Sequence, residues 1–356
     1  MASDSLTAAL PPHQTGPAAW YGPEMAGRSD WAVSLSAVDV AEIEAAMRGI
    51  VAGGGDIARL GRAEFPLPTL APKLAHMLDQ LLAGRGFVLL RGLPVERYSM
   101  REAATAFFGI GAHLGNARSQ NARGHVLGHV KDMGLSSADP NVRIYQTSER
   151  QTYHTDSCDV VGLLCLKTAK RGGLSTLVSS TTIFNEMRRR RPDLLALLFR
   201  PIATDRRGEV PAGMKPYFEI PVFNWHAGQL SAIYQRQYID SAQRLDGAPR
   251  LTAAQIEALD LFDDLANDPS LHLHMEFQLG DIQFVHNHTL LHDRTAFEDW
   301  EAQDQRRHLL RLWLACPGAR PLPPVYAQRY GKIDIGDRGG IIVPGTTALN
   351  APLEVV

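Results

Sequence analysis

Three side chains in this chain have the types and spacing to bind one metal ion. His154 and Asp156 stand two positions apart, and His292 lies far downstream. In an extended segment, residues i and i+2 point to the same side, so the first two side chains can converge on one ion. Two imidazoles and one carboxylate form a triad that suits non-haem iron(II) and leaves positions open for a co-substrate and dioxygen. The pattern therefore predicts an iron(II) site.

Two arginines after the distal histidine indicate what the co-substrate would be. They belong to an alternating segment that reads as a strand and places on one face Arg307, Leu309, Arg311 and Trp313. A guanidinium buried beside a metal is unfavourable unless an anion meets it, and its planar fork matches a carboxylate. A dicarboxylate such as 2-oxoglutarate would chelate iron with one end and pair with Arg307 or Arg311 at the other.

With these features the chain resembles the iron(II)- and 2-oxoglutarate-dependent dioxygenases of the taurine dioxygenase and γ-butyrobetaine hydroxylase type, over residues 80–316. The resemblance rests on four motifs, each weak alone and specific together. They are the His-x-Asp of His154 and Asp156, the Gly-Gly-Leu-Ser-Thr segment at 172–176, the Asn-x4-His of Asn287 and His292, and the Arg-x3-Arg of Arg307 and Arg311.

The resemblance implies a role for each of these residues. The same three ligands would bind iron. Ser175 or Thr176 would hydrogen-bond the co-substrate carboxylate, and Asn287 would belong to the same co-substrate site. Arg307 and Arg311 would anchor 2-oxoglutarate, with Arg307 expected to be the main anchor.

Two departures from the family pattern affect the assignment of these roles to residues of this chain. The interval from His292 to Arg307 is longer than the usual spacing, so the loop at 296–305 is expected to carry an insertion. The usual Asp-Asn pair before the distal histidine is His286-Asn287 here. A second histidine is therefore expected near the site.

Two other groups of histidines could in principle bind a metal. His286 and His288 have the spacing of one strand face and could join the distal histidine. His272, His274 and Glu276 also project from one face of a predicted strand. Their strict alternation with apolar residues is, however, typical of an antiparallel strand with one solvated face. We therefore favour the first triad and interpret the last group as a polar strand face.

The activity implied by the resemblance is hydroxylation of an unactivated C–H bond in a small, anionic metabolite, with release of succinate and CO2. Because Asp156 is present, halogenation is not expected. Arg311, Tyr234 and Arg236 are candidates for substrate contacts. Desaturation or cyclisation in natural-product biosynthesis would use the same site. Two further alternatives are a non-catalytic protein that binds 2-oxoglutarate or metal and a zinc hydrolase, which needs no buried anchor for a dicarboxylate.

Composition agrees with an enzyme that acts on a small molecule. The chain has 356 residues, of which 45% are hydrophobic and 21% charged, and its formal net charge is −2. That charge gives no reason to expect nucleic acid or an anionic membrane as a partner. The three cysteines are too few for a disulfide framework, and the sequence lacks a signal segment or an 18-residue apolar span, so a cytoplasmic location is expected.

The predicted fold is mainly β with flanking helices, a double-stranded β-helix or distorted jelly roll like that of clavaminate synthase. We expect an irregular arm at 1–30, one domain at 31–316 with an insertion or lid at about 201–244, and a Pro/Gly-rich tail at 317–356 that wraps the domain or contributes to a homo-oligomer. Hydrophobic periodicity predicts helices at 38–51, 70–83, 99–108 and 252–267, two more ending near 191 and 199, and strands within 84–92, 162–168, 174–180, 282–285 and 306–314.

Overall fold

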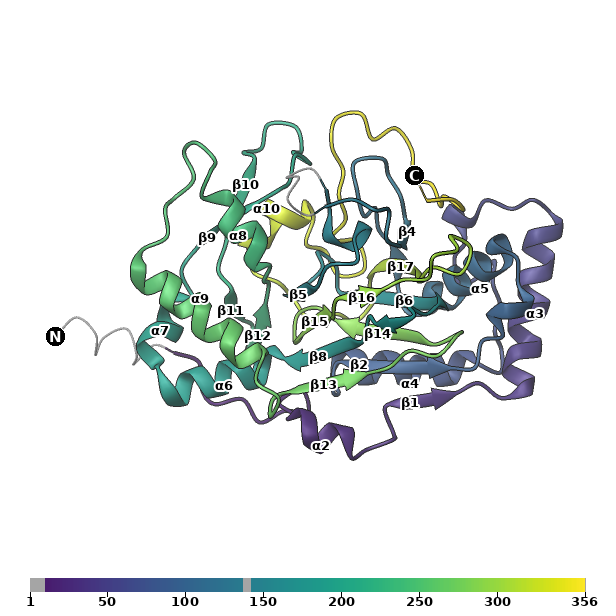
Figure 1. Cartoon of the computed structure of the whole chain (residues 1–356), viewed down its shortest axis with the longest axis horizontal. Coiled ribbons are helices and arrows are strands. Elements are labelled where there is room, and N and C mark those ends of the chain that lie inside the picture. Colours follow the sequence, from purple (N-terminus) through teal and green to yellow (C-terminus); the bar gives the residue numbers. More distant parts are fainter. Residues whose placement is uncertain (1–9, 137–141, 356) are drawn as a thin grey trace.

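Two β-sheets form the centre of the computed structural model, which describes residues 10–136 and 142–355 (Figure 1). The larger sheet has seven strands, in the order β1 (Ala32–Ser34), β2 (Phe87–Arg91), β14 (Ile282–His286), β6 (Val160–Lys167), β17 (His308–Ala315) and β3 (Asn116–Ala117), with β4 (Leu127–Val130) also paired to β17. The smaller sheet has the order β13 (His272–Met275), β8 (Ser175–Ser179), β15 (Leu290–Arg294) and β5 (Gln151–His154). Apart from the β1–β2 pair, the pairings in both sheets are antiparallel.

A shared apolar layer lies between the two sheets. The larger sheet contributes Phe87 and Trp313 to it, and the smaller sheet contributes Leu177, Leu273 and Leu290. Alternate residues of a strand point to opposite faces, so these strands can place apolar side chains in this layer while their other residues face elsewhere. The polar residues of the candidate site come from the same strands.

Three helices cover the other face of the larger sheet. They are α3 (Ala37–Ala52), α4 (Ala71–Leu82) and α5 (Met100–Ala112). Ser36 and Ser99 begin α3 and α5 with capping boxes, in which a serine and an acidic side chain satisfy free backbone N–H groups. The helices predicted at 38–51, 70–83 and 99–108 are therefore confirmed, with small shifts at their ends.

A second helical cluster packs at the end of the smaller sheet. It contains α6 (Ser180–Arg190), α7 (Pro192–Leu197) and α9 (Ala253–Ala266). The predicted insertion contains two hairpins and a helix, namely β9 (Ile202–Asp205), β10 (Tyr217–Ile220), β11 (Phe223–His226), β12 (Gln229–Ala232) and α8 (Arg236–Ala242). Residues of β11 and β12 share the apolar cluster with these helices. The insertion thus belongs to the packed body of the protein.

Both terminal segments pack on this body. Residues 1–9 of the predicted arm lie outside the described residues, while Trp20 and Met25, beside and within α2 (Gly22–Ala26), are buried. In the tail, which includes α10 (Ala327–Tyr330), Arg338 is completely buried and donates to Asp159 at 2.8 Å. Among residues 10–136 and 142–355, no helix combines the length and apolar character needed to span a bilayer.

Candidate metal centre

His154, Asp156 and His292 come together at one end of the smaller sheet. One ligand atom from each lies within 4.8 Å of the others. His154 ends β5 and is paired directly across the ladder with His292 of β15, which places the two ring centroids 4.1 Å apart. Asp156 follows the strand in a loop, and its Oδ2 lies 3.8 Å from Nε2 of His292. β5 stops at His154, so Asp156 lies two residues beyond the end of the strand.

Hydrogen bonds orient two of these side chains. Nδ1 of His154 donates to the carbonyl oxygen of Thr152 at 2.8 Å, which leaves Nε2 as the lone-pair nitrogen. That nitrogen accepts from the Gln151 amide at 2.9 Å, so the amide occupies a position that a metal would take. Asp156 accepts from Nε1 of Trp313 at 2.9 Å. The arrangement keeps one histidine nitrogen and one carboxylate directed toward a common point.

Electrostatics favour the protonation states that bind a metal. Burial lowers the pKa of His154, and burial together with His154 lowers the pKa of His292 to about 3. Both rings are therefore neutral near pH 7. Burial acts to raise the pKa of Asp156, but the charge of Arg311 and the hydrogen bond from Trp313 act in the opposite direction, and the pKa is lowered. Nδ1 of His292 is buried without a partner in the described chain. Two imidazole nitrogens and a carboxylate fit a divalent transition metal.

Beside the triad is a cavity of about 450 Å3, here called the smaller cavity, and two arginines in its wall form no ion pair with the described residues, although Nη2 of Arg294 donates to the carbonyl oxygen of Glu149. It is lined by His154, Ser175, His292, Arg294, Arg307 and Arg311, among others. Nη1 of Arg307 and both Nε and Nη1 of Arg294 are buried and have no hydrogen-bond partner among the described residues. Burial lowers the pKa of Arg307 to about 10, and burial with the nearby Arg307 lowers that of Arg294 to about 9. An anion is the partner that this wall lacks.

Arg294 was missed in the sequence, although it lies two positions after His292 on the same strand. Its spacing could have identified it, because both side chains point to one face of β15. Arg311 differs from both other arginines. Its Nε donates to Gln120 at 2.7 Å and its Nη1 lies 3.9 Å from Asp156, so it already has partners.

Of the other predicted co-substrate residues, one lines the smaller cavity and two do not. Ser175 lines the smaller cavity, and its hydroxyl donates to Gln283 at 3.0 Å. Thr176 donates to Asp293 at 3.1 Å and is not part of the cavity wall. Asn287 is also absent from that wall; its Oδ1 accepts from the backbone nitrogen of Asp156. The structure therefore separates Ser175 from Thr176 and connects Asn287 to the metal loop.

The rival histidines have other partners. His286 contacts Thr289 at 2.9 Å, and His288 contacts Asp159 at 2.9 Å; neither belongs to the metal-binding group found in the described residues. On β13, His272 is half-buried and His274 is exposed. The interpretation of that face as solvated is confirmed, since the intervening apolar residues are buried.

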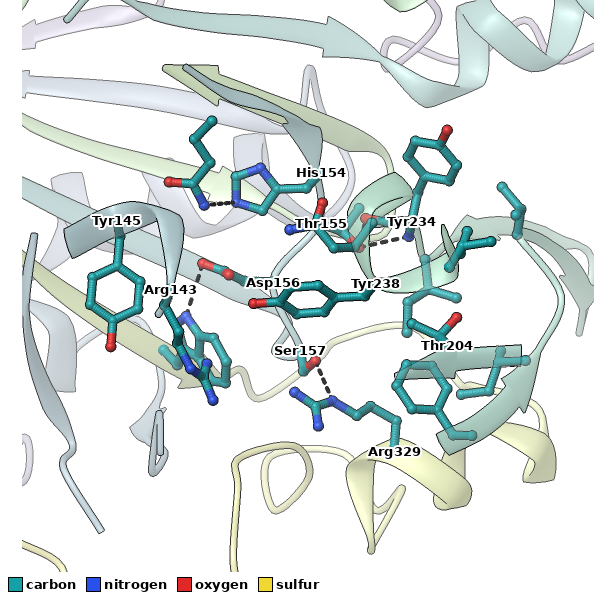
Figure 2. A pocket seen from close by; sticks show the side chains of 18 of the residues that line it. Arg143, Tyr145, His154, Thr155, Asp156, Ser157, Thr204, Tyr234, Tyr238 and Arg329 are labelled. Carbon is teal, nitrogen blue, oxygen red and sulfur yellow. Dashed lines mark hydrogen bonds between the residues drawn. The ribbon is translucent and has the colours of Figure 1, made fainter. Parts of the chain in front are cut away.

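A second cavity of about 700 Å3, the larger cavity, is lined by both His154 and Asp156 (Figure 2). Tyr234 lines it, although its hydroxyl donates to Asp263 at 2.6 Å. Arg236 does not line it, because Asp240, Asp260 and Asp263 hold its guanidinium on the outside of α8. Three residues of this wall that the sequence analysis did not select are Arg143, Tyr238 and Arg329.

Comparison with known proteins gives consistent matches. The model of the family described as taurine catabolism dioxygenase TauD, TfdA family matches residues 53–313. The chain is 34% identical to FR-33289 synthase of Streptomyces rubellomurinus, over 89% of this chain and 95% of the relative. It is 34% identical to a taurine hydroxylase-like protein of Stachybotrys chartarum, over 83% of this chain and 77% of the relative.

Two more distant matches are also informative. A uridine-5′-phosphate dioxygenase of an Amycolatopsis species is 30% identical over 49% of this chain and 65% of that relative. The structure of asparagine oxygenase with Fe(II), hydroxyasparagine and succinate superposes with a TM-score of 0.61 at 19% identity, covering 80% of this chain and 93% of that chain. The latter similarity concerns the fold.

Proposed function

Because the chain belongs to the taurine catabolism dioxygenase (TauD, TfdA) family, we propose that it hydroxylates a small anionic metabolite at the site formed by His154, Asp156 and His292. The protein is an iron(II)- and 2-oxoglutarate-dependent dioxygenase. When bound, iron(II) with 2-oxoglutarate and dioxygen supplies the oxidation that places a hydroxyl group on a C–H carbon, while succinate and CO2 are released. The observation that carries the assignment is the convergence of the triad beside two buried arginines that form no ion pair with the described residues.

In this proposal the chain's own residues bind and orient the reactants. His154, Asp156 and His292 hold iron. Arg307 pairs with the distal carboxylate of 2-oxoglutarate, and Arg294 adds a second positive charge to the same wall, as the free guanidinium nitrogens of both support. Ser175 would donate to the same carboxylate in place of Gln283.

Arg311 has a different position and we assign it a different role. It lines both cavities and lies 3.9 Å from Asp156. Its bond to Gln120 keeps the guanidinium in place, so it holds the ligand carboxylate ionised and separates the two cavities. Arg307 is therefore the main anchor of the co-substrate.

The substrate would bind in the larger cavity, because His154 and Asp156 of the triad line it. Residues of the insertion at 201–244 form part of its wall. The insertion is connected to the triad, because the backbone nitrogen of Thr155 donates to the carbonyl oxygen of Tyr234 at 2.8 Å. A relative that acts on uridine 5′-phosphate supports an anionic substrate. Desaturation or cyclisation at the same carbon would use these groups equally.

The alternation of strands between the two sheets supports the finer description of the fold. Along the chain, β5, β6 and β8, and after the insertion β13, β14, β15 and β17, belong in turn to the smaller and the larger sheet. We infer a double-stranded β-helix with the site at one end, within one domain at 31–316. The arm and the tail at 317–356 would then be packed extensions of that domain.

An anaerobic titration tests the proposed function. Metal-free protein is given iron(II) and then 2-oxoglutarate, and the weak visible charge-transfer band of the chelate is followed. We expect the band in the wild type, its loss in His154→Ala, and its retention in His274→Ala, which removes an exposed histidine. Iron binding without the band would contradict the co-substrate assignment, and activity without dioxygen would contradict the oxidation.

A further inference from the structure

Arg329, in the C-terminal tail, presents a guanidinium to the larger cavity without a carboxylate partner. Its Nε donates to the hydroxyl of Ser157 at 2.7 Å, which is its only side-chain hydrogen bond to the described residues, and it forms no ion pair with them. Its Cζ lies 5.6 Å from the centre of the Phe218 ring. Ser157 follows the metal ligand Asp156 directly. The tail therefore places a fixed cation beside the metal loop.

A second arginine faces the same region. Arg143 lines the cavity and forms an ion pair with Glu209. Burial lowers the pKa of Arg329; Glu209 opposes this effect and the neighbouring Arg143 adds to it. Two guanidinium groups thus stand near one carboxylate, which leaves a net positive charge. In Figure 2, Asp156 and Tyr238 lie between His154 and these two arginines.

The rest of the cavity wall is largely apolar. Phe218, Ile220 and Val222 line it from β10 and the residues after it, and Ile233 and Ile239 line it from the other part of the insertion. A ligand with a charged end at Arg329 and a carbon skeleton along this wall would bury its apolar part and extend toward the triad. The cavity thus has one end that recognises charge and another that reaches the site of oxidation.

We propose that Arg329, Arg143 and Ser157 form a subsite for a phosphate or phosphonate group of the substrate. The inference deepens the proposed function and rests on it. The three groups come from three separate segments, namely the residue just before the 3-10 helix Ile144–Gln146, the loop after β5, and α10. A carboxylate is satisfied by one planar fork, whereas a tetrahedral phosphorus group presents three strong acceptor oxygens and a charge of about −1.5 to −2. Several donors from different segments suit the second geometry better.

Calorimetric titration with small probes tests this subsite. Ethylphosphonate, ethyl phosphate, ethanesulfonate and propionate are each added to the protein with and without iron(II) and 2-oxoglutarate. We expect the two phosphorus probes to bind at least tenfold more tightly than the sulfonate and the carboxylate. The phosphorus probe that binds more tightly shows whether the subsite prefers a phosphonate or a phosphate ester. No binding of either phosphorus probe at millimolar concentration, or equal binding of propionate, overturns the proposal.

Variants locate the binding. Arg329→Gln is expected to weaken binding of the phosphorus probes at least tenfold, whereas Lys332→Gln removes one exposed charge from the same tail segment and is expected to leave it unchanged. Glu209→Gln removes the competing carboxylate of Arg143 and is expected to tighten binding several-fold. Unchanged binding in Arg329→Gln, or weaker binding in Glu209→Gln, overturns the proposal.

The chelate band separates this inference from the function on which it rests. A band that persists in Arg329→Gln while probe binding is lost supports the subsite. A missing band in the wild type contradicts the iron and 2-oxoglutarate assignment, whatever the probes do. Thermal unfolding of each variant shows whether it is folded. If Arg329→Gln does not fold, Arg329→Lys and Glu209→Gln test the subsite instead. Arg329→Lys keeps the positive charge and is expected to bind the phosphorus probes several-fold less tightly than the wild type.

Discussion

Oδ1 of Asn287 accepts a hydrogen bond from the backbone nitrogen of Asp156 at 2.8 Å. The bond connects the turn between β14 and β15 to the loop after β5, two segments far apart in the sequence. The amide nitrogen of the same Asn287 side chain donates to Cys158 at 3.3 Å. Because Asp156 is not held by a strand, Asn287 fixes the backbone that carries this ligand.

We therefore expect Asn287→Ala to weaken metal binding by about 10- to 100-fold, the usual effect of losing a group that orients a ligand. Titration with iron(II) or cobalt(II) under anaerobic conditions measures this. The matched control is Asn267→Ala, which removes an amide at the end of α9. An unchanged affinity in Asn287→Ala would show that the loop holds its conformation by other contacts.

Gly173 makes room for Arg307, the proposed anchor of 2-oxoglutarate. A Cβ on this residue would lie 2.9 Å from Nε of Arg307, and its φ is +68°. Gly173→Ala is expected to displace Arg307 and to raise the Kd for 2-oxoglutarate at least tenfold, about 1.4 kcal/mol, with metal affinity unchanged. Gly213→Ala has a similar φ of +72° and an open surrounding, so it controls for backbone strain alone. Equal effects of the two substitutions would exclude the steric explanation.

Arg307→Ala is expected to weaken 2-oxoglutarate binding by about 2–5 kcal/mol, as when a buried charge pair loses one partner. The adjacent Arg306→Ala should have little effect, since that side chain donates to the backbone of Trp300 and does not line the cavity. The intensity of the chelate band against 2-oxoglutarate concentration gives both affinities. Equal losses in Arg307→Ala and Arg311→Ala would mean that the two arginines share the carboxylate.

Stability at mildly acidic pH is expected to depend on a buried histidine pair. Nδ1 of His129 and Nε2 of His308 are 2.8 Å apart, and burial followed by His129 lowers the pKa of His308 to about 3. Unfolded His308 binds a proton below about pH 6.5, whereas the folded residue does not until about pH 3. Stability is therefore lost as the pH falls from about 6.5 toward 3, by up to about 1.4 kcal/mol per pH unit for this group.

Urea unfolding at pH 7 and pH 5 measures that dependence. In His308→Gln the fall in unfolding free energy between the two pH values should be smaller than in the wild type. His274→Gln, which alters an exposed histidine, should not change it. An identical pH dependence in His308→Gln and the wild type would assign the acid sensitivity to other groups.

The tail is expected to be essential for stability. Asp159 is completely buried and accepts from both Arg338 and His288. Arg338→Met would leave a buried carboxylate with one partner fewer, and a loss of about 3–5 kcal/mol is expected. Chemical denaturation measures it, with Arg123→Met as a control that removes an arginine outside this cluster. A loss below 1 kcal/mol, as is usual for an exposed ion pair, would show that the tail is only loosely attached.

Local pattern was sufficient for several elements, and the motifs also singled out the three proposed metal ligands, whose ligand atoms lie within 4.8 Å of one another. The predicted strand at 282–285 is β14, and the predicted helix at 252–267 is α9. Such predictions succeed because periodicity and capping depend on residues within a few positions of one another. The spacing of His154, Asp156 and His292, with the later arginines, also predicted which side chains meet.

Only the tertiary structure decided how the other residues are used. Arg236 carries the charge expected of a substrate contact, yet three carboxylates of α8 and α9 hold it outside the larger cavity. Arg329 stands in a tail without a motif, and packing of that tail brings it to Ser157. Arg294 became a candidate site residue only because it lines the same cavity as Arg307. These are contacts between distant segments, and the burial and the neighbouring groups that give a side chain its function are brought together only when the chain folds.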